Sequence, residues 1–386
     1  MTGQIVSYLE SRLNDYLDDL RTLVSIDSGT RDKAGVDRVN AWLERRLSSQ
    51  GFVVERHPQT EVGDNLLATL DGGGAGHILL LGHSDTVFPQ GTAAERPLTI
   101  AGDKALGPGA CDMKAGLLTG LYAVAALREL GFQDFGRITY LCVSDEEIEE
   151  RHSPGLIRAA ARQADAALTL EAARENGDIV VARKGLRVYA IEAFGRAAHA
   201  GVEPEKGRNA ILATAHLIIA LYQLNGYRPD VTVSPGVIKG GSEPNVVPDY
   251  AKLLVDLRAF TIDDLRAATD AIAEQVEQEF VPGVRMQMTL VGHGHEPMPY
   301  TPAAAALEAL AQQAASELGF HVRGARTGGA SDASLAAAEG KPVLDGLGPI
   351  GGRDHSPDEY ILLSSIVPRT ALLAKLIMAI ADRQKE

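Results

Sequence analysis

The spacing of hydrophobic side chains predicts alternating helices and strands in the first part of the chain. Leu9, Leu13, Leu17, Leu20 and Val24 recur at the i, i+4 spacing of a helix that faces a core. Further helices are predicted at 36–47, 114–130 and 154–164, and strands at 52–54, 65–70, 78–81, 137–143 and 166–170. Several strands are nearly continuous apolar runs, which is typical of an α/β domain with a largely parallel sheet. A glycine cluster at 72–76 predicts a hairpin turn between two of the strands.

The middle of the chain has a different order of elements. Strands are predicted at 186–194, 231–238, 250–257 and 285–291, and helices at 209–224 and 261–278. This β-α-β-β-α-β order is typical of a ferredoxin-like α+β unit. The first pattern then resumes, with helices at 302–318, 332–338 and 364–381 and a strand at 342–347. The sequence therefore predicts one α/β domain, residues 1–184 and 296–386, interrupted by an inserted domain over residues 185–295.

The composition and net charge of the chain argue against several classes of binding partner. The 386 residues carry a formal net charge of −14, which argues against nucleic acid or anionic lipid as a partner. The two cysteines are too few for a disulfide framework. The chain has neither a run of about 18 uncharged apolar residues nor a secretory signal at its start. We therefore expect a cytoplasmic protein that has no membrane partner.

Residues that can bind metal follow the predicted strands. In open α/β sheets, functional groups gather just beyond the carboxyl ends of the strands. Four of the predicted strands are followed by histidine, aspartate or glutamate, and a fifth segment with such a residue is the loop that opens the helix at 114–130. These residues are His83, Asp85, Asp112, Glu146, Glu147, Glu171 and His355.

Two imidazoles and three carboxylates suffice for a pair of zinc ions. Each ion would take one histidine, one terminal carboxylate and one oxygen of a shared aspartate. An open position on each ion would leave room for a water molecule that loses its proton near neutral pH. Glu146 and Glu147 are neighbours, and neighbouring side chains in extended backbone point to opposite sides. One of them can therefore bind metal while the other acts as a general base.

Each of these signals has an ordinary explanation when it is taken alone. His83 with Asp85 could be a surface pair at the end of a strand, and residues 146–150 could be a solvated cluster of charge. His355 could be an exposed loop residue. Cys111 could be a thiol nucleophile, although no paired histidine motif accompanies it. The joint occurrence of the donors in a coherent α/β pattern favours the metal site.

The motifs resemble those of the M20 family of metallopeptidases. Its members include glutamate carboxypeptidase, acetylornithine deacetylase, succinyl-diaminopimelate desuccinylase and aminoacylase. The matching stretches run in family order over nearly the whole chain, and the likeness to the glutamate carboxypeptidase branch is strongest from 326 to 360. The stretches are 82–87 (GHSDTV), 107–116 (GPGACDMKAG), 144–147 (SDEE), 195–201 (GRAAHAG), 245–248 (NVVP), 256–258 (DLR), 326–332 (RTGGASD) and 355–356 (HS).

The resemblance implies a catalytic domain of the zinc-exopeptidase type that binds two zinc ions, or cobalt or manganese in their place. Asp112 would bridge the two ions. His83 and Glu171 would complete one site, and Glu147 and His355 would complete the other.

Catalytic roles follow from the same resemblance. Glu146 would be the base that later protonates the leaving nitrogen. Asp85 would hold the ring of His83 in place. A cis peptide bond would follow Asp112.

The inserted domain would be a lid and a dimerisation surface. His199 would reach the active site of the partner subunit in a homodimer and stabilise the oxyanion. Arg258 and Asn245 would hold the carboxylate of the substrate. The ordinary alternatives are a loop histidine, a surface arginine on a strand and a turn-forming asparagine.

Two segments depart from the family pattern. Residues 148–151 read Ile-Glu-Glu-Arg where family members often have Gly-Ser, and residues 291–297 contain two histidines where glutamate carboxypeptidases tend to have arginines.

These residues predict a di-zinc hydrolase that cuts an amide bond next to a free carboxylate. The substrate would be a small molecule, either a short peptide cut by a carboxypeptidase or an N-acyl amino acid. The alternatives are a deacylase or desuccinylase of the same mechanism, a non-catalytic metal-binding protein, and a thiol hydrolase that uses Cys111.

Overall fold

The computed structural model describes residues 1–383, and contacts divide the chain into two compact units. The first unit comprises residues 1–182, 300–327 and the chain from residue 331 onward, and the second comprises 183–299 and 328–330. The sequence-based boundaries are residues 185 and 295, and they leave 328–330 with the catalytic domain. In the structure this short segment accepts hydrogen bonds from two arginines of the second unit: Arg258 donates to the carbonyl of Gly328 and Arg183 donates to that of Gly329.

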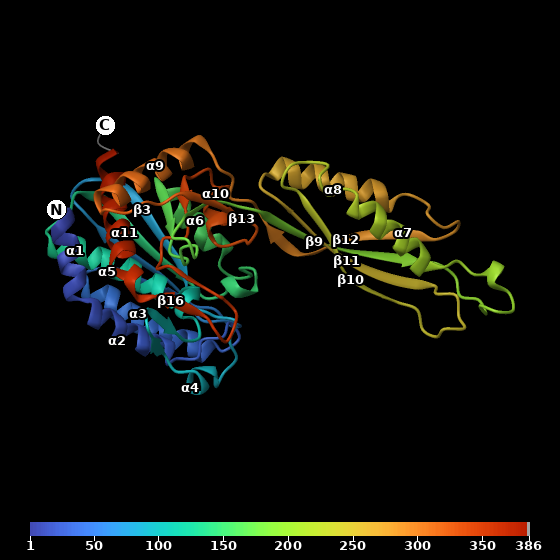
Figure 1. The fold of residues 1–386 in the computed structure, drawn as a ribbon, viewed down its shortest axis with the longest axis horizontal. Coiled ribbons are helices and arrows are strands. Elements are labelled where there is room, and N and C mark those ends of the chain that lie inside the picture. Colours follow the sequence, from blue (N-terminus) through green and yellow to red (C-terminus); the bar gives the residue numbers. More distant parts are fainter. Residues whose placement is uncertain (384–386) are drawn as a thin grey trace. The chain divides into compact units, whose positions relative to one another are not determined.

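A six-stranded sheet forms the centre of the first unit (Figure 1). The second strand in spatial order pairs antiparallel with both of its neighbours, and the other three pairs are parallel, so the α/β class predicted from the sequence is confirmed. The order across the sheet is β1 (Val53–His57), β2 (Asn65–Asp71), β6 (Phe135–Val143), β3 (Ala75–His83), β7 (Ala166–Thr169) and β14 (Val343–Leu344).

The predicted hairpin at 72–76 is wrong. Strand β6 lies between β2 and β3 and pairs with both of them. The glycines are needed for close approach to the segment that leads into β6. Gly72 donates to the carbonyl of Gly136, and a Cβ on Gly72 would lie 2.1 Å from the carbonyl oxygen of Phe135.

Helices cover the central sheet, and their boundaries are close to those predicted. The helix predicted from Leu9 to Val24 is in fact two helices, because the backbone leaves the helical conformation at Arg12. The helices of the first unit are α1 (Thr2–Ser11), α2 (Leu13–Val24), α3 (Lys33–Ser49), α4 (Thr92–Glu95), α5 (Ala115–Glu129), α6 (Pro154–Gln163), α9 (Pro302–Glu317), α10 (Ala333–Ala338) and α11 (Leu363–Arg383).

Two of these segments are long and apolar enough to cross a membrane by length and composition, which the sequence analysis did not anticipate. They are Ala110–Glu129, which includes α5, and α11. The first is 89% buried and the second 61% buried inside the protein. Both contribute to the hydrophobic core of the first unit, so their apolar character is explained by packing.

Several short strands were not predicted. A four-stranded sheet has the order β15 (Gly351–Gly352), β16 (Tyr360–Leu362), β5 (Lys104–Leu106) and β4 (Thr99–Ala101). A further pair consists of β8 (Ile179–Arg183) and β13 (Gly324–Thr327). The four-stranded sheet matters for function, because β15 and β16 flank the loop that carries His355.

The second unit is a four-stranded antiparallel sheet with two helices. Along the chain it consists of β9 (Gly185–Phe194), α7 (Ala210–Tyr222), β10 (Thr232–Gly240), β11 (Tyr250–Ala259), α8 (Ile262–Val276) and β12 (Arg285–His295). The order across the sheet is β10, β11, β9 and β12, with every pair antiparallel. Alternate residues of β11 are buried, and leucines of both helices pack on the same core, so the helices cover one face of the sheet (Figure 1).

Candidate metal centre

The ends of three neighbouring strands bring donor residues to one edge of the central sheet. Strands β6, β3 and β7 are parallel, so their carboxyl ends meet there. His83 is the last residue of β3, and Glu171 follows β7 by two residues. Glu146 and Glu147 begin a short 3₁₀ helix, Glu146–Ile148, directly after β6.

The remaining two donors come from irregular segments. Asp112 lies in Ala110–Lys114, where the backbone of Asp112 and Met113 is not helical, just before α5. The peptide bond between Asp112 and Met113 is cis, as the family resemblance predicted. His355 lies in the loop between β15 and β16.

The carboxylate of Asp112 lies between two imidazoles. Its Oδ1 is 3.0 Å from Nε2 of His83, and its Oδ2 is 3.1 Å from Nε2 of His355. Each histidine also faces a glutamate: Oε1 of Glu171 is 3.5 Å from the His83 nitrogen, and Oε2 of Glu147 is 3.2 Å from the His355 nitrogen. The five predicted donors therefore form two clusters that share one aspartate.

The chemistry of this donor set fits a pair of divalent metal ions. Donor atoms of His83, Asp112 and Glu147 all lie within 4.8 Å of one another, and nitrogen and oxygen ligands in such numbers suit zinc and related metals. Burial, followed by the charge of Asp112, raises the pKa of Glu171 to about 7. Burial also raises the pKa of Glu147. A cation would favour the charged form of these carboxylates, which burial alone disfavours.

The histidines already show how strongly the site attracts positive charge. Hydrogen bonds with Asp112 and Glu147 raise the pKa of His355 to about 10. Burial lowers the pKa of His83, but its bonds with Asp112, Asp85 and Glu171 outweigh burial and raise that pKa well above its usual value. A metal ion would take the place of these protons on the ring nitrogens.

Asp85 contacts one residue of each cluster, His83 and Glu147. The Nδ1 of His83 is 3.0 Å from the backbone carbonyl of Asp85 and 3.4 Å from its Oδ1. The backbone carbonyl of Asp85 is therefore the nearer of the two oxygens that face this ring nitrogen. The Oδ2 of Asp85 accepts hydrogen bonds from the hydroxyl of Thr30 and from the backbone N–H of Glu147.

Glu146 shares the electrostatic environment of the donors. Burial raises its pKa well above the usual value. The positive charge of His83 opposes this shift, and the negative charges of Glu171 and Asp332 add to it. A carboxyl group with a raised pKa is suited to hold a proton and pass it on.

The predicted residues of the inserted domain lie in two places within the second unit. The backbone N–H of Ala200, next to His199, donates to the carbonyl of Asn245 at 2.9 Å. Arg258 is near the other end of β11, where it pairs with Asp256 at 3.0 Å. An extended strand rises about 3.3 Å per residue, so Tyr250 and Arg258 lie roughly 26 Å apart. Asn245 precedes Tyr250, so Asn245 and Arg258 of one chain cannot hold the same carboxylate.

Two further acids are buried in this unit, and their burial was not predicted from the sequence. Glu150, which the sequence placed in a solvated cluster, is only 3% exposed, and Asp332 is fully buried. Burial raises the pKa of Glu150 to about 8 and raises that of Asp332 well above its usual value. The sequence signal was the departure from Gly-Ser at residues 148–151.

Cys111 is not suited to be a nucleophile. It is buried, and burial together with the charge of Asp354 raises the pKa of its thiol. A thiol attacks only as the thiolate, so the structure argues against the thiol hydrolase alternative.

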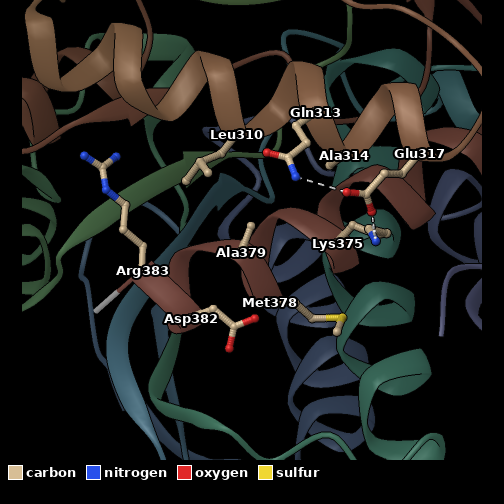
Figure 2. Close-up of a pocket in the computed structure, with 9 residues that line it drawn as sticks. All are labelled: Leu310, Gln313, Ala314, Glu317, Lys375, Met378, Ala379, Asp382 and Arg383. Atoms are coloured by element: carbon tan, nitrogen blue, oxygen red, sulfur yellow. Dashed lines mark hydrogen bonds and ion pairs between the residues drawn. The ribbon is translucent and has the colours of Figure 1, made fainter. Parts of the chain in front are cut away.

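Two hollows of the first unit differ in their relation to the donors. One of about 510 Å³ lies between residues 172–176, which follow Glu171, and residues 351–354, which precede His355. Another of about 430 Å³ lies between α9 and α11 (Figure 2). None of its nine lining residues is a predicted site residue, and two of them, Glu317 and Lys375, form an ion pair. The first hollow adjoins the candidate site.

The fold and the donor set define the class of the protein: a metal-dependent hydrolase with the architecture of a zinc exopeptidase. Comparison with known proteins agrees. The chain belongs to peptidase family M20/M25/M40, whose family model matches residues 79–379. The resemblance noted in the sequence is thereby confirmed.

Relatives of this chain carry out more than one reaction. Carboxypeptidase G2 of Pseudomonas sp. (strain RS-16) is 33% identical over 367 residues, which cover 93% of this chain and 88% of that protein. Acetylornithine deacetylase of Edwardsiella ictaluri (strain 93-146) is 27% identical over 388 residues, covering 93% and 95%. The solved structure of aminopeptidase PepT from Bacillus cereus has a TM-score of 0.82 at 23% identity, covering 96% and 99%. These similarities support the family and the fold and leave the substrate open.

Proposed function

We propose that the protein is a di-zinc carboxypeptidase that cleaves an amide bond next to a free carboxylate. Its substrates would be short peptides or N-acyl amino acids. The observation that carries the proposal is the Asp112 carboxylate, each of whose oxygens faces a separate pair of histidine and glutamate. The similarity to carboxypeptidase G2 over nearly the whole chain supports the choice of reaction.

Five residues would hold the metal ions. His83 and Glu171 would bind one ion, Glu147 and His355 the other, and Asp112 both. When bound, the pair of ions supplies Lewis acidity and a water molecule that loses its proton near neutral pH. Zinc fits these ligands, and cobalt or manganese would fit them as well.

Two further residues would serve the chemistry. Glu146 would take the proton from the attacking water and then donate it to the leaving nitrogen, which its raised pKa supports. Asp85 would keep Nε2 of His83 directed at the metal by fixing the other ring nitrogen. The hollow next to residues 351–354 would receive the part of the substrate that lies against the metal.

The second unit would form a homodimer and complete the site. Its surface supports this role, because α7 exposes Ile219 and Tyr222 at 60% and 69%. Helix α7 also contacts β10, an edge strand of the sheet, whose outer backbone groups have no neighbouring strand to pair with. The separation of Asn245 and Arg258 within one chain gives a second reason. If both bind one substrate carboxylate, they must come from different subunits.

His199 would then act with Asn245 of the same chain. The two lie side by side in the second unit, so a dimer that delivers Asn245 to the partner's substrate would deliver His199 as well. His199 would donate to the oxyanion, and Arg258 of the other chain would hold the carboxylate. We also infer that the enzyme acts in the cytoplasm on small soluble substrates.

The decisive experiment is the Glu146→Gln substitution. We expect kcat to fall by about 10²–10⁴-fold, the range for loss of a general base, while zinc content stays at two ions per chain. Glu149→Gln is the matched control, because Glu149 is an exposed neighbour in the same acidic run. Full kcat in the Glu146 variant, or full activity after the metal is removed with a chelator, would contradict the proposal.

A deacylase or desuccinylase with the same metal chemistry is the second candidate. The similarity to acetylornithine deacetylase and to succinyl-diaminopimelate desuccinylase favours it. A panel of N-acetyl amino acids, N-succinyl amino acids and dipeptides separates the two reactions by their kcat/KM values. A non-catalytic metal-binding protein would need no free acid at position 146, and the presence of Glu146 argues against it.

A further inference from the structure

Glu359 binds the loop that carries Asp112. Its side chain is only 1% exposed. One carboxylate oxygen accepts hydrogen bonds from the backbone N–H groups of Cys111 at 2.7 Å and Asp112 at 3.0 Å, and the other accepts from that of Gly109 at 3.0 Å. This role could not be predicted from the sequence, where Glu359 stands in a short polar run.

The loop has a particular need for such an acceptor. Gly109 has a left-handed backbone (φ 71°), and Asp112 and Met113 leave the helical conformation just before α5 begins. Backbone N–H groups in such a segment cannot all bond within a helix, and they cost free energy when they are buried without an acceptor. The two oxygens of the Glu359 carboxyl group accept from three of these N–H groups, so Glu359 fixes the backbone directly at Asp112.

Glu359 also belongs to the segment that carries His355. It lies four residues after His355 and directly before β16, whose first residue, Tyr360, pairs with Leu106 of β5. The backbone N–H of Gly107 approaches the carbonyl of Glu359 at 3.4 Å. The His355 loop is therefore joined to the Asp112 loop in three ways: by the pairing of β16 with β5, by the backbone of Glu359 and by the side chain of Glu359.

The two halves of the donor set differ in how they are held. His83 ends a buried strand of the central sheet, and its side chain is fully buried. The side chain of His355 is 53% exposed, on a loop with positive φ at both Arg353 and His355. The cluster that contains His355 therefore depends most on the link through Glu359.

We propose that Glu359 is a positioning residue for the metal centre, which holds the Asp112 carboxylate and His355 at the spacing that the second metal position needs. This inference rests on the proposed di-zinc function. Glu359 touches neither metal nor substrate and acts through three backbone N–H groups.

The test is a zinc titration of Glu359→Gln against a chromophoric chelator, with the wild-type protein alongside. A glutamine oxygen can replace only one of the two carboxylate oxygens, so its amide N–H₂ group must face at least one of the three backbone donors. We expect the weaker of the two zinc sites to lose about 10–100-fold in affinity, the range for residues that orient metal ligands. The other site should change by less than about 3-fold. Glu359→Asp, which keeps the charge on a shorter side chain, should fall between wild type and Glu359→Gln.

Hydrogen exchange of the metal-free protein gives a readout that does not depend on activity. The amides of residues 109–112 should exchange at least 10-fold faster in Glu359→Gln, while those of β3 stay protected. Asp358→Asn is the matched control, because Asp358 is the adjacent acid, its side chain is 68% exposed and it pairs with Arg353 at the surface. The control should leave both readouts unchanged.

The outcomes separate this inference from the function on which it rests. Two unchanged zinc sites in Glu359→Gln, or an equal weakening of both, would overturn the positioning role while the di-zinc function stands. A wild-type protein that binds no pair of zinc ions would overturn both. If Glu359→Gln does not fold, the same two readouts on Glu359→Asp decide the question.

Discussion

The two units of the chain depart in opposite ways from the usual pattern of a buried apolar core and a polar surface. The first buries His83, Asp85 and Asp332 almost completely, although burial of such groups costs free energy unless they find partners. The second buries aliphatic side chains beneath two helices and leaves Ile219 and Tyr222 exposed on the surface of α7. Polar groups kept in a core indicate a site for ions, and apolar groups kept on a surface indicate a site for another protein surface. The first unit therefore has the features of a site for chemistry, and the second has those of a surface for assembly.

The largest effect on stability should come from Arg369 in the first unit. Its guanidinium is buried in α11 and donates to the backbone carbonyls of Gly177, Gly346 and Gly348. Arg369→Ala would leave three acceptors without donors, each of which costs about 1–3 kcal/mol. Because water can enter the space left behind, we expect a total loss of about 3–5 kcal/mol in the free energy of unfolding. Urea unfolding followed by the fluorescence of Trp42, the only tryptophan of the chain, reports on this unit.

The control for that measurement lies in the second unit. Arg285 is an exposed residue of β12, and Arg285→Ala should change the stability by less than about 0.5 kcal/mol. Because Trp42 lies in the first unit, the urea unfolding of this variant is followed by circular dichroism. A loss below about 1 kcal/mol for Arg369→Ala would mean that a buried charge in the first unit is no more important than a surface charge. The contrast between the units would then lose its energetic basis.

The next effect concerns metal binding and should be confined to the first unit. We expect Asp112→Asn to weaken zinc binding by more than about 100-fold, the upper range for residues that only orient a ligand, or about 2.7 kcal/mol. Asp256→Asn is the matched change in the second unit, where Asp256 pairs with Arg258, and it should leave zinc binding unchanged. Zinc content after dialysis and a chelator competition measure both variants. Equal zinc binding in the two variants would contradict the placement of the metal centre.

These donors could be predicted because each has a local signal in the sequence. His83 and Glu171 follow apolar strands, and Asp112 precedes a helix. Glu359 and Arg369 have no such signal, because their partners are backbone groups of segments distant in sequence. Sheet pairing was misjudged at residues 72–76 for a related reason: the partner of β2 is β6, and a strand of later sequence cannot be recognised from a nearby glycine cluster.

The short strands show a further limit of prediction from the sequence. Strands β15 and β16 contain only two or three residues, too few for an alternating pattern to appear. The loop they hold carries His355, which was predicted as a donor from its place after the strand at 342–347, whereas its grouping with Asp112 and Glu147 came only from the family resemblance. The packing of Glu150 against Asp332 could not be foreseen either, because a run of charges usually lies in water.

A smaller effect should follow from the exposed surface of the second unit. Ile219→Asp places a charge in the apolar face of α7, which we expect to be covered in the dimer. A buried anchor residue is worth about 2 kcal/mol or more at an interface, so dimer affinity should fall by about 30-fold. The melting temperature of the second unit should hardly change, because Ile219 is exposed within one chain. Sedimentation over a range of concentrations measures the dissociation constant.

An exposed charge of the same unit is the control for that change. Glu274→Lys in α8 reverses a charge on the other helix of the same unit, and it should leave the dissociation constant unchanged. A monomeric wild-type protein, or an Ile219→Asp variant that associates as tightly as wild type, would show that the exposed apolar face serves another purpose.

The remaining effect should be a pH dependence that arises from Glu150. Burial raises its pKa to about 8 in the folded protein, from 4.5 in an ordinary glutamate. The folded chain therefore keeps a proton that the unfolded chain loses as pH rises from 4.5 to 8, so the free energy of unfolding falls with rising pH across this window. Glu150→Gln cannot lose that proton, and it should be more stable than wild type at pH 8 and equal to it below pH 4.5. The gain in the free energy of unfolding is smaller than the loss of one whole proton from Glu150 would give between pH 4.5 and pH 8, because Asp332 can share the proton.

The second unit offers the opposite sign for comparison. A hydrogen bond from Thr261, together with the ion pair to Arg228, lowers the pKa of Asp264. Its contribution to stability is therefore present above the usual aspartate pKa and is lost as pH falls through the lowered value. Glu149→Gln, an exposed neighbour of Glu150, controls for the loss of a negative charge. A Glu150→Gln variant that is no more stable than wild type at pH 8 would mean that the buried acid finds a cation in the folded protein, and the metal centre would then extend further into the core than the five donors indicate.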